Sequence, residues 1–431
     1  MPIVGAAVAL VIGACLIAGC GRAPVAAAGG RIPHPAFLRI ARVPVGQVAI
    51  DPVSGTLYIT TTGGIGAIDT ANQEHQVFTE GPRDVVCGVA VDGVDHHLLV
   101  YVLRYGPHAS TARFPKATGL VQMIDATTGA LLSTVTMERL FSVCELISPP
   151  LVAVDSGTDH GFVTDAAGQS LEIDMDTGGV VRRFHIPSLS YFSPIFPSDA
   201  GPWVLDTGRH RLIASTIRHC SNSCAAPDTI VTVDTDSGQV VNRAPVPGAP
   251  VDVLSLDSAT GRVYFRSDVL GGDIFTVDDR SGRLTARVRV APLFSGDTLT
   301  GNVIADSGTH HAYLYIGGAA LKGTGLPGKH NGPAHLIVVN KNGTRVLRRV
   351  PLPNPRAGED AGAAFVDPVT NRLFIDVGAH LLVLDPSTLN VIQTIRLPNF
   401  SYNGYDGLIL DTTNHRILAY GPRGIKALDE G

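Results

Sequence analysis

The sequence predicts an all-β protein, an eight-bladed β-propeller, and three observations lead to this prediction. Short runs of Val, Ile, Leu, Phe and Tyr at alternate positions are separated by turns of Asp, Ser, Thr and Gly. A pattern of paired hairpins recurs about every 50 residues, a period typical of propellers and solenoids. No long amphipathic helix is predicted between the hairpins. Four-stranded sheets repeated around an axis satisfy all three observations.

The clearest repeat runs from Val251 to Val290. Two predicted strands, Val251–Leu256 and Arg262–Arg266, flank the turn D257-S-A-T-G-R, and two more, Asp273–Val277 and Leu284–Val290, flank D278-D-R-S-G-R. Asp suits the start of such a turn because its carboxylate accepts hydrogen bonds from backbone N–H groups two residues on. Gly supplies the positive φ that the turn needs. A single sheet of this kind cannot bury both faces, so it must stack on copies of itself.

Copies of this repeat occupy the rest of the chain. A first hairpin begins at each of eight aspartates, Asp51, Asp92, Asp155, Asp206, Asp257, Asp306, Asp367 and Asp411. A second hairpin follows seven of them, with turns that begin at Asp69, Asp125, Asp174, Asp234, Asp278, Asn340 and Asp385. We therefore predict eight blades, with seven as the fallback should one irregular repeat not form a blade.

The two ends of the repeat region predict how the ring closes. The eighth repeat has three strands and ends near Asp429, so it lacks an outermost strand. An unpaired strand, F37-L-R-I-A-R-V-P, precedes the first repeat and matches outer strands such as V346-L-R-R-V-P-L-P. We expect it to complete the last blade, because closure removes a sheet edge that would otherwise be exposed.

The N-terminus predicts export. Residues 1–19 form an uncharged apolar run that ends in L16-I-A-G-C20, as in a secretory signal. This ending resembles the bacterial lipobox, which implies that Cys20 is lipidated, and Gly21 after it favours the outer membrane. No Lys or Arg precedes the run, so an uncleaved membrane anchor or another cleavage site are the alternatives. Residues 20–36 form a tether, and residues 37–431 form the propeller domain on the periplasmic side.

Charge and cysteine content agree with an exported binding protein. A net charge of −5 gives no general attraction to nucleic acid, so no nucleic-acid partner is expected. Beyond the signal, four cysteines remain in an oxidising compartment. We predict one disulfide between Cys220 and Cys224, which share a loop, and a second between Cys87 and Cys144, which precede adjacent innermost strands.

Long connections are predicted to gather on one face of the ring. The turns within each hairpin are short, whereas the longer segments join second to third strands or one blade to the next. These segments are Arg104–Gly119, Glu138–Pro150, Ser188–Gly201, Ile217–Thr229, Gly317–Ala334, Pro351–Ala361 and Leu397–Asp406. Because long loops on a rigid scaffold are the usual place for binding surfaces, this long-loop face is the predicted functional surface.

Two sets of residues on the long-loop face are candidate site residues. Carboxylates recur before the innermost strands, at Asp84, Glu145, Asp199, Asp297, Glu359, Asp360 and Asp406. They could hold Ca²⁺, although Asp in such loops also caps turns, and we expect no cofactor. Aromatic residues cluster at Tyr191, Phe196, Trp203, Tyr402 and Tyr405, where they could anchor a protein partner or pack the loops onto the blades.

Seven histidines lie in the first turns, and their number alone would suggest a metal site. They are His96, His97, His160, His210, His310, His311 and His415, and Arg262 and Arg372 stand in their place in other repeats. A position that exchanges with Arg is more typical of blade packing than of metal binding, so neither copper nor zinc is expected. Sequence motifs for nucleophilic, zinc-peptidase or nucleotide chemistry are absent.

The repeats resemble the YVTN-type and quinoprotein-like propeller superfamily over about Val48 to Asp429. D257-S-A-T-G-R-V-Y-F and D125-A-T-T-G-A-L-L carry the resemblance most clearly. Quinoprotein dehydrogenases stack their cofactor on Trp residues, whereas this chain has a single Trp, so pyrroloquinoline quinone is not expected. The lipid-anchored ring is also similar in architecture to the propeller lipoprotein of the outer-membrane barrel-assembly machinery.

Two functions follow from these observations. The first is a non-catalytic binding or scaffolding propeller that presents its long-loop face to a protein or another envelope component. The alternative is a metal-assisted hydrolase, lactonase or lyase, in which the acidic residues of that face hold the cation.

Overall fold

The computed structural model describes residues 48–429, apart from 62, 70–73, 82, 107–115, 142–150, 166–168, 186–202, 217–227, 247–250, 268–272, 291–302, 317–333, 354–363, 378–379, 397–406 and 422–423. In this part of the chain every regular element is a β-strand, and no helix capable of crossing a membrane is present. All the described residues belong to one compact unit, Pro35–Glu430.

The strands form eight antiparallel sheets in which neighbours in sequence are neighbours in space. Blades 1 to 4 are β1 (Val48–Ile50), β2 (Leu57–Thr61), β3 (Gly64–Ile68), β4 (Glu74–Thr79); β5 (Asp84–Asp92), β6 (His97–Tyr105), β7 (Lys116–Asp125), β8 (Leu131–Phe141); β9 (Leu151–Asp155), β10 (His160–Thr164), β11 (Gln169–Asp174), β12 (Val180–His185); and β13 (Trp203–Asp206), β14 (Arg211–Thr216), β15 (Asp228–Asp234), β16 (Val240–Val246).

Blades 5 to 8 continue the same order. They are β17 (Val251–Asp257), β18 (Arg262–Ser267), β19 (Ile274–Asp278), β20 (Arg283–Val288); β21 (Val303–Asp306), β22 (His311–Ile316), β23 (His335–Val339), β24 (Val346–Pro351); β25 (Ala364–Asp367), β26 (Arg372–Val377), β27 (His380–Leu384), β28 (Val391–Arg396); and β29 (Gly407–Asp411), β30 (Arg416–Gly421), β31 (Gly424–Asp429). Within the described residues the eighth sheet has three strands, as predicted.

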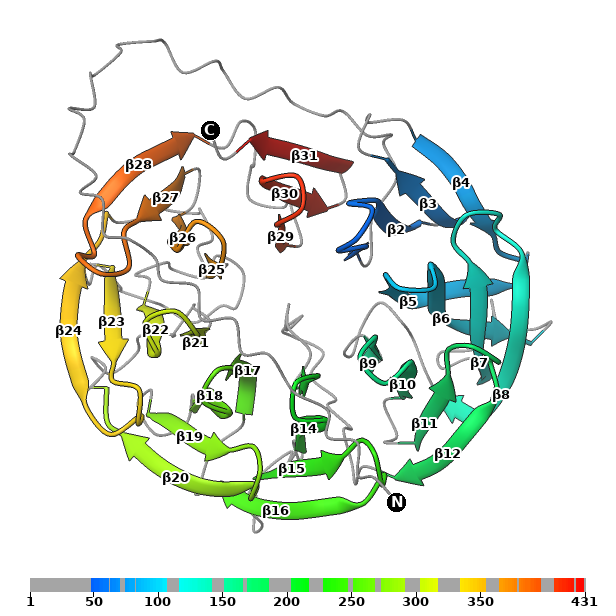
Figure 1. Cartoon of the computed structure of the whole chain (residues 1–431), viewed down its shortest axis with the longest axis horizontal. Coiled ribbons are helices and arrows are strands. Elements are labelled where there is room, and N and C mark those ends of the chain that lie inside the picture. Colours follow the sequence, from blue (N-terminus) through cyan, green and yellow to red (C-terminus); the bar gives the residue numbers. More distant parts are fainter. Residues whose placement is uncertain are drawn as a thin grey trace, which may run out of the picture. The chain divides into compact units, whose positions relative to one another are not determined.

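The eight sheets form a ring, with the first strand of each blade nearest the axis and the last at the rim (Figure 1). The predicted eight-bladed β-propeller is therefore confirmed, and the seven-bladed fallback is excluded. The strand F37–P44 that was predicted to complete blade 8 lies outside the described residues, so its pairing stays a prediction.

The hydrophobic core consists of one apolar cluster at each junction between neighbouring blades. The cluster between blades 2 and 3, for example, packs Leu99 and Tyr101 of β6 against Val163 of β10 and Leu171 of β11. Blades 8 and 1 meet in the same way, through Leu418 and Leu57 among others. Because each blade buries its faces against two neighbours, closure of the ring completes the core.

A register shift recurs in the outer hairpin of all seven four-stranded blades. In six of these blades a shift falls near the turn, for instance between Thr276 and Val277 of β19, whereas in blade 1 it falls between Ile65 and Gly66. Such bulges increase the local strand twist. Blade 2 departs from the prediction in length, since β6, β7 and β8 continue into segments predicted as loops, through Tyr105, from Lys116 and through Phe141. The pair of Lys116 with Phe141 shows that strand pairing extends this far.

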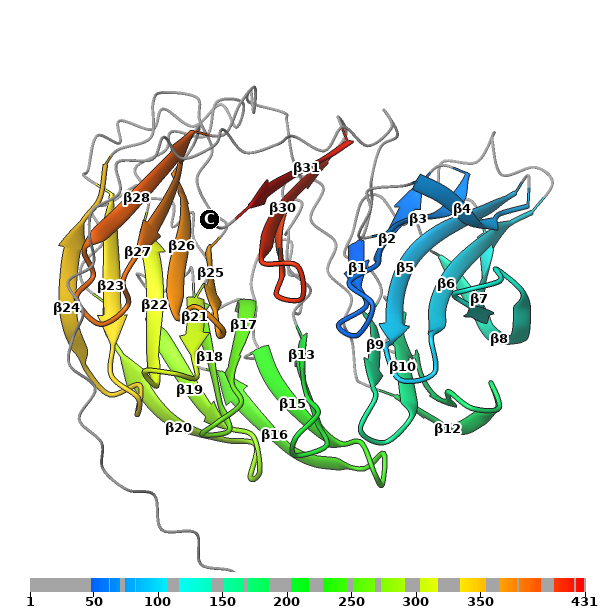
Figure 2. The same cartoon turned by 45° about the horizontal axis from the view of Figure 1, so that its top comes forward.

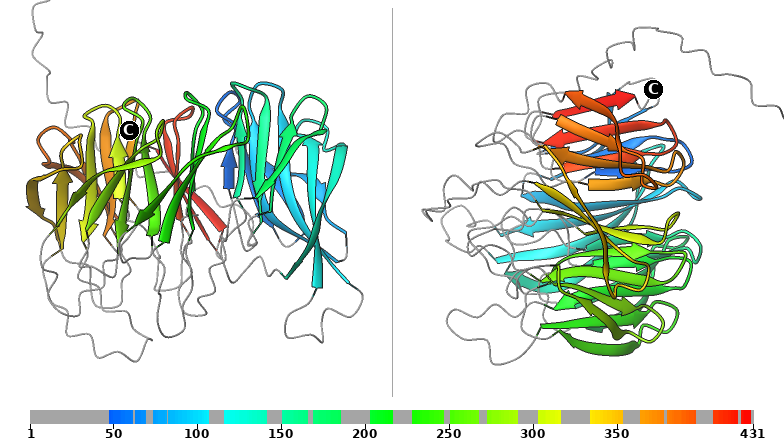
Figure 3. Two further views of the ribbon diagram at one scale, coloured as in Figure 1. Left: turned by 90° about the horizontal axis from the view of Figure 1, so that it is seen from below. Right: turned by 90° about the vertical axis from the view of Figure 1, so that its left-hand side faces the viewer.

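Among the described residues, the turns that join first to second strands and third to fourth strands lie on one side of the ring, which we call the tight-turn face (Figures 2 and 3). The strand ends that flank the second-to-third and blade-to-blade connections point to the opposite side, the long-loop face. Most of those connections lie outside the described residues.

Candidate functional site

Eight buried aspartates form the framework of the tight-turn face. Each is the Asp predicted to begin a first hairpin, and each is no more than 1% exposed; we call these the turn aspartates (Asp51, Asp92, Asp155, Asp206, Asp257, Asp306, Asp367 and Asp411). Their carboxylates accept hydrogen bonds from the backbone N–H groups two or three residues on, such as Val53 N–H to Asp51 at 2.8 Å and Asn414 N–H to Asp411 at 3.0 Å.

Four residues after each turn aspartate, the backbone adopts a positive φ of 51° to 70°. This junction position holds Gly55, His96, Asp159, His210, Gly261, His310, Asn371 and His415. Gly has no steric penalty in this region, and Asn, Asp and His tolerate it better than most other residues do. The turn therefore restricts this position to a few residue types.

The histidines of these turns occupy two positions, not the single equivalent position predicted from the sequence. His96, His210, His310 and His415 are junction residues with positive φ, whereas His97, His160 and His311 come one residue later and begin the second strand. Arg262 and Arg372, which were compared with them, belong to the second set.

Junction histidines reach back to the turn aspartate of the preceding blade. Nδ1 of His210 lies 3.0 Å from Oδ2 of Asp155, and Nδ1 of His96 lies 3.2 Å from Oδ2 of Asp51. Nδ1 of His310 lies 3.4 Å from Oδ2 of Asp257. The hydrogen bond to Asp155 raises the pKa of His210, against the effect of burial and with the help of Asp236. These histidines have a structural role as links between blades.

Seven of the eight turn aspartates also accept a side-chain hydrogen bond. The donors within their own turns are Ser54, Arg209, Thr260, Thr309, Thr370 and Asn414, each three residues after the aspartate, and Asp155 accepts from His210. Asp92 is the exception. Its Oδ1 accepts the Val94 N–H at 3.1 Å, but its buried Oδ2 has no hydrogen-bond partner among the described residues.

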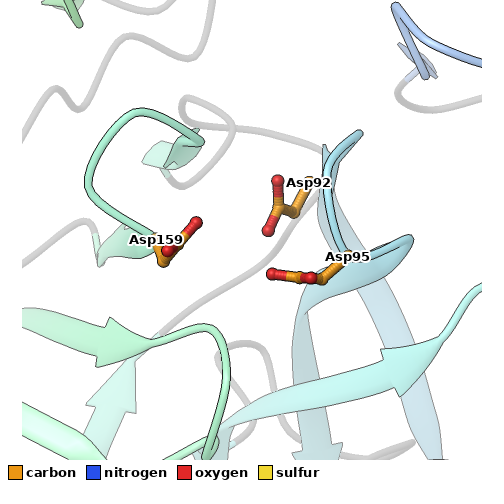
Figure 4. A group of neighbouring side chains, drawn as sticks. All are labelled: Asp92, Asp95 and Asp159. Atoms are coloured by element: carbon orange, nitrogen blue, oxygen red, sulfur yellow. The ribbon is translucent and has the colours of Figure 1, made fainter.

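The surroundings of Asp92 are acidic. Asp95 occupies the position three residues on, and Asp159 is the junction residue of the next blade. One carboxylate oxygen from each of Asp92, Asp95 and Asp159 lies within 4.8 Å of the others, and the three side chains point toward one another (Figure 4). Burial, together with the carboxylates of Asp176, Asp92 and Asp95, raises the pKa of Asp159. That these three residues form a group was not predicted from the sequence.

A second departure from the repeat occurs between blades 4 and 5. The junction residue there is Gly261, and Asp279 fills the space that a side chain at that position would need, since a Cβ on Gly261 would lie 2.5 Å from Oδ1 of Asp279. Burial and the neighbouring carboxylate of Asp206 raise the pKa of Asp279 to about 7. Arg209 lies between the two acids, 2.9 Å from Asp206 and 3.7 Å from Asp279.

Two further buried carboxylates, Glu172 and Asp273, are paired with basic side chains of their own blade. Glu172 of β11 is fully buried and lies 2.9 Å from Nδ1 of His160 and 3.5 Å from Arg182. Asp273, also fully buried, accepts a hydrogen bond from Nε of Arg287 at 2.6 Å. These partners compensate for carboxylate charges that would be costly to bury alone.

Three of the residues predicted on the long-loop face fall within the described part of the chain. Asp84 begins β5, and both of its carboxylate oxygens accept hydrogen bonds from Arg104 at 2.8 Å, which lowers the pKa of Asp84. This pairing occupies the oxygens that a cation would need. Trp203 begins β13 and packs against the apolar cluster between blades 3 and 4. Cys87 is buried in β5, at 5% exposure.

The other predicted residues lie outside the described residues, so their roles stay predictions. They are Cys20, Cys144, Cys220, Cys224, Glu145, Asp199, Asp297, Glu359, Asp360, Asp406, Tyr191, Phe196, Tyr402 and Tyr405.

Comparison with known proteins identifies the fold. No protein-family model matches the chain, and no curated protein sequence matches it. Among solved structures, the chain is similar to the Dos1 propeller (TM-score 0.61, 11% identity, 92% of this chain and 95% of that one). It is also similar to BamB from Moraxella catarrhalis (0.53, 13%, 92% and 98%) and to the C-terminal WD40 domain of Sif2 (0.58, 10%, 93% and 100%). At these identities the likeness shows a β-propeller fold.

Proposed function

We propose that this protein is a non-catalytic binding or scaffolding propeller, anchored by lipid to the periplasmic side of the outer membrane, which binds a protein or another envelope component with its long-loop face. The observation that carries the proposal is the asymmetry of the ring. The tight-turn face consists of short turns closed by hydrogen bonds of the turn aspartates. The long connections of the sequence all leave from the other face, and loops of this kind are where rigid scaffolds bind partners.

The fold supports this proposal as well. The propeller neighbours include a WD40 domain and BamB, which cover nearly the whole of this chain. Within the described residues, the core is built from blade-to-blade packing of the strands, which gives the long-loop face a rigid support. Asp84, the one predicted acidic ligand in the described residues, is held by Arg104, which favours a binding role over metal-assisted catalysis at that position.

Site-specific photocrosslinking in intact cells tests the partner surface. A photoreactive side chain at Tyr191, Tyr402 or Tyr405 is expected to form adducts with a defined partner. Val53, Val94 and Val369 serve as matched controls, since they lie at the tips of tight turns and are 60–64% exposed. Adducts from the control positions alone, or from neither set, would contradict the proposal.

Metabolic labelling with a fatty acid tests the anchor. Labelling and membrane association are expected to be lost in Cys20→Ala and kept in Cys15→Ala, which changes a cysteine within the same apolar run. Equal labelling of the two variants would show that Cys20 is not the lipidated residue.

A further inference from the structure

Two departures from the repeat meet at one place on the tight-turn face, between blades 2 and 3. Three residues after the turn aspartate, the other seven blades have Ser, Thr, Arg or Asn, which can donate a hydrogen bond, and blade 2 has Asp95. At the junction position the other blades have His, Gly or Asn, and blade 3 has Asp159. The two positions that donate hydrogen bonds or bring a cation to the turn aspartate in other blades are thus both carboxylates at Asp92.

At this junction three carboxylates lie together without a cation from the described residues. Asp92 is fully buried, and its side chain points toward Asp95 and Asp159 (Figure 4). Its Oδ2 has no hydrogen-bond partner among the described residues. In the described part of the chain no Lys, Arg or His forms an ion pair with any of the three carboxylates. The nearby His160 is directed to Glu172 instead, and His96 to Asp51. A buried carboxylate without a partner is costly, and two more acids beside it raise that cost.

The junction between blades 4 and 5 shows how this chain neutralises clustered acids elsewhere. Asp206 and Asp279 approach each other there, and Arg209 contacts both. In blade 2 the residue equivalent to Arg209 is Asp95, so this position of the turn holds an acid in place of a cation. An external cation would complete the same arrangement.

We propose that Asp92, Asp95 and Asp159 bind a hard divalent cation, with Ca²⁺ as the best match, which links blades 2 and 3. Hard cations prefer oxygen ligands, and Ca²⁺ accepts carboxylates in flexible geometry at about 2.3–2.6 Å. Oxygens that share one Ca²⁺ lie at most about 5 Å apart at these bond lengths, and the three carboxylates meet that condition. The exposed Asp176, in the next turn of blade 3, adds negative charge beside them. The site is on the face opposite to the predicted partner surface.

Calorimetric titration of the full chain in mild detergent, after chelator treatment and dialysis, tests this site with Ca²⁺, Mg²⁺ and Mn²⁺. The informative variants restore the ordinary repeat. Asp159→His creates the junction residue found in blades 2, 4, 6 and 8, and Asp95→Thr creates the donor found in blades 3, 5, 6 and 7. Asp236→Asn is the control, because Asp236 holds the same turn position in blade 4 as Asp176 does in blade 3.

We expect one Ca²⁺ per wild-type chain, with affinity at least tenfold weaker in Asp159→His and in Asp95→Thr and unchanged in Asp236→Asn. A hundredfold excess of Ca²⁺ over its Kd is expected to raise the wild-type Tm by about 3 °C. In chelator, Asp159→His is expected to unfold at or above the wild-type Tm, since it restores a His–Asp link. Absence of saturable binding, or retention of wild-type affinity in both variants, would overturn the proposal. The first result would leave a shared proton as the neutralising charge.

Discussion

At the scale of single residues, the tight-turn face depends on carboxylates that are buried and satisfied. A buried ionised carboxylate is destabilising unless hydrogen bonds or a cation compensate it. Asp257 shows the usual arrangement: it accepts the backbone N–H groups of Ala259 and Thr260, and the Thr260 hydroxyl donates to its second oxygen at 2.5 Å. The positive φ at Gly261 then turns the chain into the second strand.

His210 makes one of these carboxylate contacts dependent on pH. Its pKa is raised in the folded protein, mainly by Asp155, so the folded state binds the proton more tightly than the unfolded state. The resulting stability is fully present below the unfolded pKa of about 6.5 and is lost as pH rises through the folded pKa. The Tm difference between the wild type and His210→Asn is therefore expected to be larger at about pH 5.5 than at about pH 8.5.

Asn is the appropriate replacement in this test because Asn371 adopts positive φ at the same position. His415→Asn is the control, since no ion pair of His415 with a carboxylate occurs in the described residues. A Tm difference for His210→Asn that does not change with pH would show that the His210–Asp155 contact carries no charge-dependent stability.

At the scale of the structural element, each junction is a unit in which the residues of two blades depend on each other. Blade 4 combines His210 with Thr235, whereas blade 5 combines Gly261 with Asp279, at equivalent turn positions. A side chain at position 261 would overlap with Asp279. Gly261 and Asp279 are therefore expected to tolerate replacement by the residues of blade 4 only when both are changed together.

Gly261→His alone is expected to destabilise the protein by about 1–3 kcal/mol, the usual cost of overpacking a buried site. The double variant Gly261→His/Asp279→Thr, which copies blade 4, should recover most of that loss, because a histidine could then reach Asp206. A double-mutant cycle by chemical denaturation, with Asp279→Thr as the second single variant, measures the coupling. Additive effects of the two changes would contradict a shared junction.

The sequence predicted the elements well and the junctions less well. The eight turn aspartates were found because one residue type recurs at one offset in every repeat. The junction position was not separated from the one after it, because its residues, such as Gly55, His96 and Asn371, share a backbone conformation and not a chemical type. Asp92 and Asp159 come from different repeats, and only the stacking of blades 2 and 3 brings them together. Comparing the repeats at fixed offsets from the turn aspartate could have revealed both departures.

At the scale of the whole molecule, the ring is closed by contacts between its first and last blades. Leu57 and Ile59 of blade 1 share an apolar cluster with Leu418 and Ile425 of blade 8. On the tight-turn face, the Thr413 hydroxyl donates to the carbonyl oxygen of Pro52 at 2.9 Å. The closing junction thus has an apolar cluster between its blades, as the seven other junctions have. It joins blades whose residues are more than 350 positions apart, and contacts this distant form slowly because a long loop must close first.

Within the described residues, strand β31 pairs with β30 on one side and with no strand on the other. The sequence F37–P44 matches the outer strands of other blades, and we predict that it pairs with β31. Deleting residues 22–45 from the full chain should then expose a sheet edge, lower the Tm and promote aggregation. Deleting residues 22–35, which removes only the tether, should leave both properties near wild type. Thermal unfolding of the two variants measures the Tm, and size-exclusion chromatography measures aggregation. Equal behaviour would mean that the apolar junction between blades 8 and 1 is sufficient to close the ring.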